Sequence, residues 1–346
     1  MPDISLLEPL VLNGVVSKFT TPEDLALLNK VPSSPVDSPY TVTWDVLKGS
    51  RQVASFNIPN SEAQVLDRLG TQQEQAKLAY VRVKKIFSPT SLTWLRQPGQ
   101  IAATNAEFYV TRELQDISQS IDLLQETALW GALRGQLSYT LPDGATETVD
   151  YKLPASHLVT RGTAWTTATP KQIVNDLVLW KRLIQTHGRV RPTTAYCSVL
   201  TVQKIFDSFA ANAGVVVTQG GYPMGTMLTD RMKDAYYNNA MLPGFAGLDW
   251  NVVEEVYTDA NGNLQRFVGD GTSSNAEVFI GNYTDNRPLE VKYGKSADSE
   301  APEGQYGKFT KTWKEHDPSQ QQVLMELAFL PVVYRPEQYV YCSDVG

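Results

Sequence analysis

Histidine serves both catalysis and zinc binding near neutral pH, and this chain has three of them. His157, His187 and His316 lie far apart in the sequence. None belongs to a spacing such as His-Glu-x-x-His, which places two ligands on one face of a helix. We therefore interpret each imidazole as a core or surface side chain, and we expect no metal site.

Nucleophilic chemistry has equally weak support. Neither the pair Ser156-His157 nor Cys197 has triad partners at a usable spacing, so we expect no catalytic residue and no enzyme. Cys197 and Cys342, the two cysteines of the chain, are far apart in sequence. We predict free, buried thiols, with a disulfide between them as the less favoured alternative.

Two glycine-containing runs could suggest ligand binding. Gly220-Gly-Tyr-Pro-Met-Gly lacks the Lys-Ser/Thr of a phosphate loop, and no dinucleotide fingerprint occurs, so we expect no cofactor and interpret the run as a flexible loop. Asp259-Ala-Asn-Gly-Asn resembles the start of a calcium loop. However, Asp270 stands where the terminal glutamate is needed and no EF-hand helix precedes the run, so a tight hairpin turn explains it better.

Composition bounds the class of protein. The 346 residues are 42% hydrophobic, which supports a real core in one elaborate domain or in two or three domains. The chain lacks an apolar run of membrane length and a basic, then apolar N-terminus, so we expect neither a transmembrane helix nor a signal peptide. A net charge of −7 argues against a protein that grips nucleic acid by neutralising phosphates.

A long amphipathic helix is predicted over residues 104–133, begun by Thr104 or Asn105 and stopped near Gly135. About 30 residues would make a rod of roughly 45 Å. The apolar stripe is Leu114, Ile117, Ile121, Leu124, Ala128 and Leu129, and the polar face is Arg112, Glu113, Gln115, Asp116, Gln119, Asp122 and Gln125. A hairpin over residues 137–152 and a second helix over residues 170–187 follow, with Gly162 and Trp165 between them.

The segments before the long helix differ in character. Residues 1–50 are broken by prolines, so we predict an extended arm with one short helix at residues 22–29 and no regular structure at 32–39. Strand-like residues 42–46, 52–58 and 80–87 surround a polar stretch at 60–79. We predict a projecting two-stranded flap that becomes ordered on a partner surface.

The sequence predicts an α/β region in the second half of the chain. We predict a strand at 194–200, a helix at 201–213, a hairpin of strands 248–257 and 264–268, and a strand at 277–281. Residues 290–318 are polar and punctuated, and strands at 323–334 and 338–342 close the chain.

The order of these pieces resembles the phage major capsid proteins of the lambda type, the major capsid protein E family, which have the HK97 shell fold. Four features carry the resemblance, and they follow one another in order over roughly residues 40–342. The first two are the flap with Gly70 and Ser88-Pro89, and the helix with Glu113-Leu-Gln-Asp followed by the hairpin ending Val149-Asp-Tyr. The other two are Arg161-Gly-Thr-Ala-Trp before a helix with Asp176, and Lys311-Thr-Trp-Lys-Glu-His-Asp-Pro before an apolar strand with Pro331. Residues 215–247 match no family feature.

The resemblance implies an α+β fold with an N-terminal arm (residues 1–50), an extended β flap or E-loop (51–98), a peripheral domain with a spine helix and hairpin (99–165), an axial α/β domain (166–285) and a return to the peripheral domain (286–346). It further implies that Trp165 and Trp313 are structural anchors and not ligand-stacking residues, with a large loss of stability on replacement by alanine if either is fully buried. On this reading, the arm stabilises contacts between subunits and contributes little to the fold of its own subunit.

The function implied by the resemblance is a shell subunit of a tailed double-stranded DNA phage. Such subunits assemble with themselves into hexamers and pentamers of an icosahedral shell, with a scaffolding protein, a portal and in some members a decoration protein. They form in the host cytoplasm, end in the virion capsid, and enclose DNA without sequence-specific binding or a membrane. Some members cross-link through lysine and asparagine. Lys84, Lys85 and Asn57 are candidates, but no local signature supports them and we expect no cross-link.

Two other classes remain open. The first is another assembly protein, either an encapsulin-type compartment or a tail or sheath subunit. Tubes would favour the tail, and closed shells holding an enzyme would favour the compartment. The second is a hydrolase with a site hidden in residues 170–290, which turnover lost on changing one carboxylate or histidine would reveal.

Overall fold

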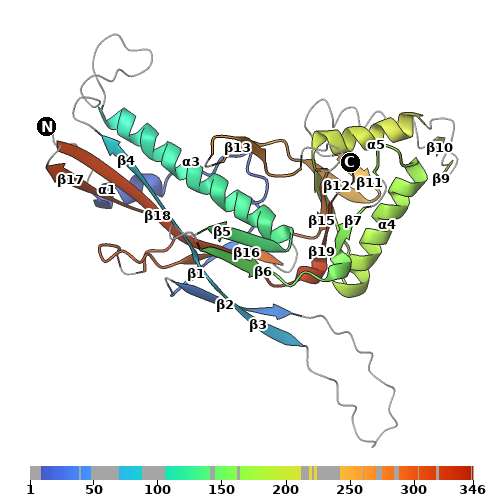
Figure 1. Ribbon diagram of the computed structural model, residues 1–346, viewed down its shortest axis with the longest axis horizontal. Coiled ribbons are helices and arrows are strands. Elements are labelled where there is room, and N and C mark those ends of the chain that lie inside the picture. Colours follow the sequence, from blue (N-terminus) through green and yellow to red (C-terminus); the bar gives the residue numbers. More distant parts are fainter. Residues whose placement is uncertain are drawn as a thin grey trace, which may run out of the picture. The chain divides into compact units, whose positions relative to one another are not determined.

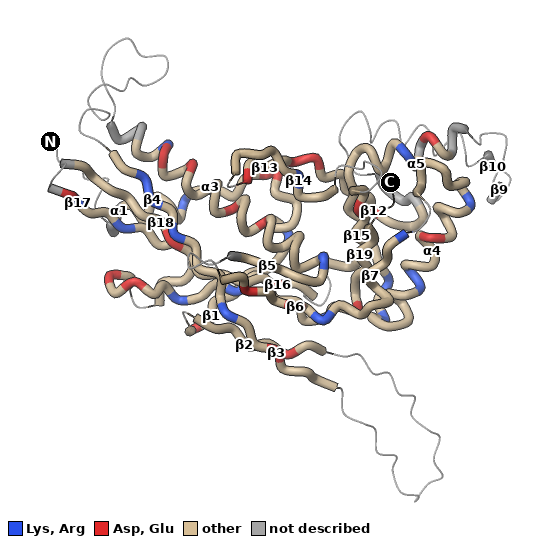
Figure 2. The backbone as a smooth tube through the Cα atoms, in the orientation of Figure 1, with Lys and Arg blue, Asp and Glu red and all other residues tan. Residues whose placement is uncertain are grey.

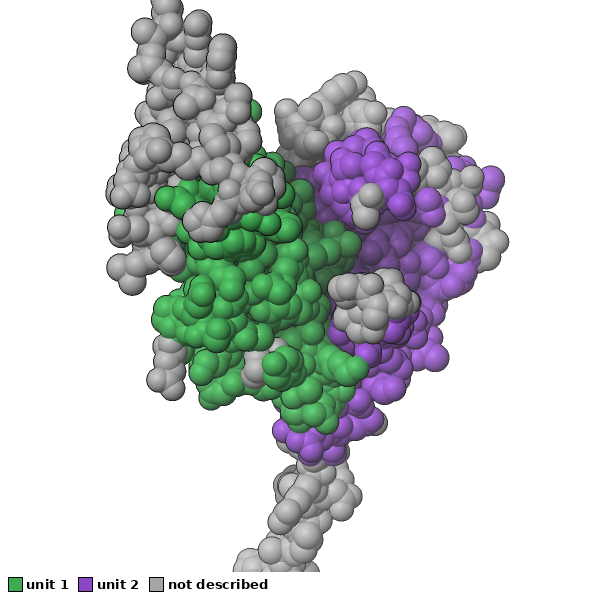
Figure 3. All heavy atoms as spheres, turned by 60° about the vertical axis from the view of Figure 1, so that its left-hand side comes forward, with its two compact units in different colours: residues 1–43, 75–129, 290–332 green, residues 44–74, 130–289, 333–346 purple. Residues whose placement is uncertain are grey.

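The computed structural model describes residues 9–38, 40–47, 70–87, 106–140, 145–161, 164–211, 218–219, 222–223, 242–259, 261–269, 275–283, 288–302, 304–316, 319–343 and 345. The fold is α+β, and the chain divides into two compact units (Figure 3). Unit 1 comprises residues 1–43, 75–129 and 290–332, and unit 2 comprises residues 44–74, 130–289 and 333–346. None of the helices described here has the length and apolar character needed to span a membrane.

The elements follow one another along the chain as Figure 1 labels them. They are α1 (Pro9–Val16), β1 (Ser33–Val36), β2 (Thr41–Leu47), β3 (Thr71–Lys77), β4 (Ala79–Phe87), α3 (Ala106–Leu133), β5 (Gln136–Thr140), β6 (Thr146–Asp150), η2 (Ala155–His157), β7 (Leu158–Thr160), α4 (Pro170–His187), β8 (Thr194–Cys197), α5 (Val199–Ala211), β9 (Thr218–Gln219), β10 (Tyr222–Pro223), β11 (Leu242–Phe245), β12 (Leu248–Val252), β13 (Val256–Thr258), β14 (Leu264–Arg266), β15 (Val278–Gly281), β16 (Leu289–Gly294), β17 (Phe309–His316), β18 (Ser319–Val333), η3 (Pro336–Gln338) and β19 (Tyr339–Ser343).

Unit 1 is built on a sheet in the order β1-β16-β18-β17, with β4 also paired to β18. The strand β18 pairs antiparallel with β17 through residues 319–326 on one side and with β4 through residues 321–329 on the other. The helix α3 lies along this sheet, and Lys85 of β4 bonds to its carboxylates Glu113 and Asp116. The strand β17 and all but the first residue of β16 fall in residues 290–318, for which the sequence predicted only polar, punctuated chain.

The long helix is confirmed, but its faces differ from the prediction. Leu124 is exposed, whereas Asp122 and Gln125 are buried together with Glu126. These polar side chains are tolerated inside because each has a partner: Lys308 bonds to Asp122, and the hydroxyl of Tyr293 donates to Gln125. The helix ends at Leu133, and Gly135 has a φ of +93°, as expected for a glycine stop. Thr104 and Asn105 lie outside the described residues.

The N-terminal segment does not behave as a separate arm. Residues 22–29 form turns instead of the predicted helix, because the amides of Leu27 and Leu28 donate to the carboxylate of Glu126 on α3. The helix lies earlier, at α1, and residues 33–36 of the proline-rich stretch form β1, which pairs parallel with β16. Apolar side chains of this segment are buried within the subunit: Leu12, Val16, Leu25, Leu27 and Val31. The prediction that it adds little to its own subunit is therefore wrong.

The predicted flap is also revised. Residues 71–77, assigned to its polar tip, form the strand β3, which pairs with β2. The strand predicted at 80–87 exists as β4, but it pairs with β18 in the main sheet of unit 1. Residues 52–58 lie outside the described part of the chain.

Unit 2 is built on a six-stranded sheet in the order β11-β12-β8-β15-β19-β7. The helix α4 covers one face with Ile173, Leu177, Trp180 and Ile184, which pack among Ala195, Val278 and Ile280. It begins with the capping box of Thr169 and Gln172, and Pro170 occupies the first turn. Its predicted range is therefore confirmed, as are the α5 helix and the strands β8, β15, β18 and β19.

Two predicted hairpins lie in unit 2. The predicted hairpin at 137–152 appears as β5 and β6. The hairpin around Asp259 appears as β13 and β14. The strand predicted at 248–257 is instead two strands in different sheets, because β12 pairs parallel with β8 whereas β13 turns away to pair with β14.

Candidate functional site

The fold brings together two histidines that the sequence left apart. His157 Nδ1 lies 2.8 Å from the carbonyl oxygen of Tyr339, so this nitrogen carries a proton, and His157 Nε2 lies 2.9 Å from His187 Nδ1. His157 is buried at η2 and His187 ends α4. Nothing in the local sequence signals this pair, because the contact depends on how α4 packs against η2.

The histidine pair favours the uncharged state of its buried member. Burial lowers the pKa of His157, and the neighbouring His187 lowers this pKa further, although the bond to the Tyr339 carbonyl opposes both effects. When His157 is neutral, its Nε2 can accept a hydrogen bond from His187. This arrangement is a structural hydrogen bond between η2 and the end of α4.

The cysteines and the calcium-like run have structural roles. Cys197 and Cys342 are free and buried, as predicted, and both oppose Val278 on either side of β15. Burial raises the pKa of Cys197 far above its ordinary value, so its thiol is a poor nucleophile. Asp259 Oδ1 accepts hydrogen bonds from the amides of Asn261 and Asn263, both at 2.9 Å, which is the geometry of a tight turn.

No three His, Cys, Asp or Glu side chains are arranged to hold a metal ion in the part of the chain that the structure describes. Residues 220–221 and 224–225 of the glycine-rich run, and the side chain of His316, lie outside the described residues. Of the cross-link candidates, Lys85 is engaged by Glu113 and Asp116. Burial opposes its charge, but hydrogen bonds to these carboxylates raise its pKa, so the amine stays protonated. Lys84 is exposed, and Asn57 lies outside the described residues.

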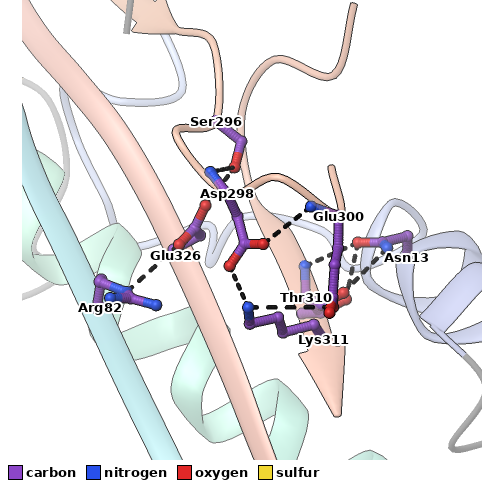
Figure 4. Close-up of polar contacts among 8 residues, drawn as sticks. All are labelled: Asn13, Arg82, Ser296, Asp298, Glu300, Thr310, Lys311 and Glu326. Atoms are coloured by element: carbon purple, nitrogen blue, oxygen red, sulfur yellow. Dashed lines mark hydrogen bonds and ion pairs between the residues drawn. The ribbon is translucent and has the colours of Figure 1, made fainter. Parts of the chain in front are cut away.

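A polar network fixes the loop after β16 onto the sheet of unit 1 (Figure 4). Ser296 donates to Glu326 on β18, and Arg82 of β4 lies 3.4 Å from the other oxygen of this carboxylate. Lys311 of β17 forms an ion pair with Asp298. Burial opposes ionisation of Asp298, but the bond from Lys311 and that from the amide of Glu300 lower its pKa. Three strands and one loop are thereby joined.

The helix α1 is attached to β17 through one side chain. Asn13 Oδ1 accepts hydrogen bonds from the amide of Thr310 at 2.9 Å and from its hydroxyl at 2.8 Å, and Asn13 Nδ2 donates to its carbonyl at 3.1 Å (Figure 4). The side-chain amide thus bonds to both backbone groups of Thr310, as a neighbouring strand would. This position of β17 is therefore closed to another strand.

In unit 2, a partly buried ion pair anchors the β13–β14 hairpin. Arg134 bonds to both carboxylate oxygens of Glu277, through Nε at 2.8 Å and Nη2 at 2.6 Å, and Nη2 also donates to the carbonyl of Phe267 at 2.6 Å. The amide of Gly269 and the hydroxyl of Tyr341 also donate to this carboxylate. Although burial opposes its charge, these bonds lower the pKa of Glu277. The carboxylate is therefore saturated and ionised.

The exposed apolar side chains indicate surfaces for association. Trp165 is fully buried and stacks on Trp180 with ring centres 5.8 Å apart, as the anchor prediction required. Trp313 is 37% exposed, so the condition of full burial does not hold for it: it lies on β17 opposite Gln322, which in turn pairs with the exposed Ile86. The described polar clusters thus fix loops and helices in place.

The chain matches a known protein family and is similar to several solved structures. Residues 31–341 match the family described as phage major capsid protein E. Among solved structures, the chain is similar to a putative capsid protein of a prophage of Escherichia coli CFT073, with a TM-score of 0.59, 18% identity and 80% of each chain covered. No match was found among the curated proteins.

Two further structures share the fold. A phage-related protein from Bordetella bronchiseptica RB50 aligns with a TM-score of 0.54 and 12% identity over 98% of this chain and 97% of that one. The chain of Gordonia phage Cozz aligns with a TM-score of 0.51 and 12% identity over 94% of this chain and 88% of that one. At these identities the likeness concerns the fold, and the family match covers most of the chain.

Proposed function

Because the chain belongs to the phage major capsid protein E family and is the major capsid protein of a tailed phage, we propose that its copies assemble into hexamers and pentamers of an icosahedral shell enclosing the double-stranded DNA genome. The observation that carries this proposal is the family match over residues 31–341, which draws on both compact units. The polar clusters described above serve a structural protein, since they immobilise surface loops.

We also propose the domain roles expected for such a shell, adjusted to the fold: an N-terminal segment (residues 1–50) that packs on its own subunit and is no free arm, an extended β flap within residues 51–98 from which β4 is excluded, a peripheral domain with a spine helix (99–165), an axial domain (166–285) and a return to the peripheral domain (286–346). The 28 residues of α3 support a spine helix, and the β2–β3 pair supports a flap. Residues 290–332 belong to the same unit as residues 75–129, which supports the return, whereas residues 333–346 belong to unit 2.

The proposed partners are the chain itself, a scaffolding protein, a portal and a decoration protein, with assembly in the host cytoplasm. A net charge of −7 is compatible with DNA that is enclosed without being gripped.

The test is negative-stain microscopy of particles from cells that produce the full chain with and without the proteins encoded beside it. We expect closed shells of uniform diameter in at least one of these conditions. Tubes would indicate a tail subunit, and shells that contain an enzyme in place of DNA would indicate a compartment. A protein that stays monomeric in every condition would overturn the proposal.

A further inference from the structure

The helix α4 has an exposed apolar centre with basic flanks. Val178 and Leu179 point away from the core, and Leu179 is 56% exposed. Lys171 and Arg182 are also exposed and share this side of the helix by their spacing, and Figure 2 shows basic positions along α4. Residues 170–191 hold five Lys and Arg against one Asp, a net charge of +4 in a chain whose total is −7. We name the exposed side chains of Lys171, Val178, Leu179 and Arg182 the α4 face.

The β13–β14 hairpin has the complementary character. Its register places Val256, Thr258, Leu264 and Arg266 on one face, where Leu264 is 71% exposed. Residues 249–266 hold four Asp and Glu against one Arg, a net charge of −3. An isolated two-stranded hairpin is marginally stable, and within the described chain this pair has no third strand. We name the exposed side of Val256, Thr258, Leu264 and Arg266 the hairpin face; Arg266 is paired with Glu254, so the negative charge of the region comes from residues 249–259 beside this face.

The two faces lie on different sides of unit 2. Figure 1 shows α4 and the hairpin on opposite sides of the six-stranded sheet. The core contacts agree: α4 packs on the face that contains Val278 and Ile280, whereas Arg134, which holds the hairpin through Phe267, lies over the ring of Phe279 on the other face. Because the Arg134–Glu277 pair fixes the hairpin, its apolar face is held ready for a partner.

The charges around the two faces determine which surfaces of two subunits can form a contact. Two α4 faces would repel each other, as would two hairpin regions, so a two-fold contact that matches a face with itself is disfavoured. The basic region around the α4 face and the acidic region around the hairpin face attract each other. A contact between two different faces of the same chain is heterologous, and repetition of such a contact generates a ring when the rotation closes.

We propose that the α4 face of one subunit binds the hairpin face of the next subunit around each ring of the shell. The occupant of the α4 face is thus a second copy of this chain. This inference rests on the proposed function, since it specifies the contact by which copies associate. In it, Val178 and Leu179 pack against Val256 and Leu264, with the basic flanks of α4 beside the acidic residues of the hairpin region.

The test is cysteine cross-linking within assembled shells. The double variant Leu179→Cys/Leu264→Cys is treated with a short bismaleimide, while the natural Cys197 and Cys342 are buried and unreactive. We expect a ladder of covalent oligomers up to five and six subunits, as proposed for pentamers and hexamers. Neither single variant should yield such a ladder. The matched control Leu200→Cys/Leu264→Cys uses another exposed leucine of unit 2 and should also give none.

Each outcome is decisive. Dimers from Leu179→Cys alone would mean that α4 meets itself, and shells without any ladder would mean that the hairpin face is not the partner of the α4 face. Either result overturns the inference and leaves the proposed function intact. Absence of shells from the wild-type chain would instead count against the proposed function. As a second measurement, Leu179→Asp should lower the yield of shells by about tenfold or more, whereas Leu200→Asp should leave it unchanged.

Discussion

Replacement of Glu126 by alanine should destabilise the subunit more than any surface change on the same helix. Glu126 is fully buried on α3, and its two carboxylate oxygens accept hydrogen bonds from the amides of Leu27 at 3.0 Å and Leu28 at 2.7 Å. A hydrogen bond to a charged group contributes about 1.5–3 kcal/mol. Loss of two such bonds should therefore lower the free energy of unfolding by about 3–6 kcal/mol, a large share of the roughly 5–15 kcal/mol typical of a protein.

The isosteric variant Glu126→Gln separates charge from shape. Its amide oxygen can accept from one backbone amide, but its NH₂ group then faces the other donor, so we expect about half the loss seen with alanine. Urea unfolding of unassembled subunits measures both variants, and trypsin cleavage after Lys30 reports opening of the turn. The control is Glu113→Gln on the same helix, which removes a partly exposed ion pair with Lys85 and should cost under about 1 kcal/mol.

The reasoning would be refuted by a Glu126→Ala variant with an unchanged urea midpoint and unchanged resistance at Lys30. That result would mean that residues 22–31 are held by apolar contacts alone. For a related reason, removal of residues 1–30 should destabilise the isolated subunit in the same urea assay, because it deletes the buried Leu12, Leu25 and Leu27.

Three further changes test other contacts. The pKa of His157 in the folded chain is below the ordinary value of 6.5, so its contribution to stability is complete above pH 6.5 and is lost as the pH falls toward the folded pKa; the urea midpoint of His157→Gln should depend less on pH in this window. Arg134→Met leaves the carboxylate of Glu277 without its cation and should cost about 3 kcal/mol by urea unfolding, with part recovered in Arg134→Met/Glu277→Gln. Trp165→Ala should cost about 3–5 kcal/mol by calorimetry, whereas the exposed Trp313→Ala should change subunit stability by less than about 1 kcal/mol.

Sequence reasoning succeeded where local signals and tertiary contacts agree. The helix α4 was predicted with its observed bounds, because Pro170 and the Thr169 cap mark its start and Ile173, Leu177 and Trp180 repeat at the helical period. It failed where the local structure depends on a hydrogen-bond partner that is distant in the sequence. Residues 22–29 carry a helix signal, but their amides bond to Glu126, which lies on α3 far along the chain.

The prediction of polar segments failed for a related reason. The strand β17 has a polar sequence, which does not indicate a strand by itself. Its backbone hydrogen bonds are made with β18, and several of its charged side chains face solvent. The buried Asp122 and Gln125 look like surface residues until Lys308 and Tyr293 supply their partners. The candidate surfaces were likewise invisible in the sequence, since exposure of Val178 and Leu179 depends on which side of α4 meets the sheet.

The bonds between Asn13 and Thr310 have a consequence for the timing of synthesis. The two residues are 297 positions apart, so at about 5–20 residues per second the ribosome reaches Thr310 roughly 15–60 s after Asn13. Until then α1 has no β17 to bind, and Leu12 and Val16 have no completed sheet to cover them. A nascent chain that stops before β17 therefore lacks a closed unit 1.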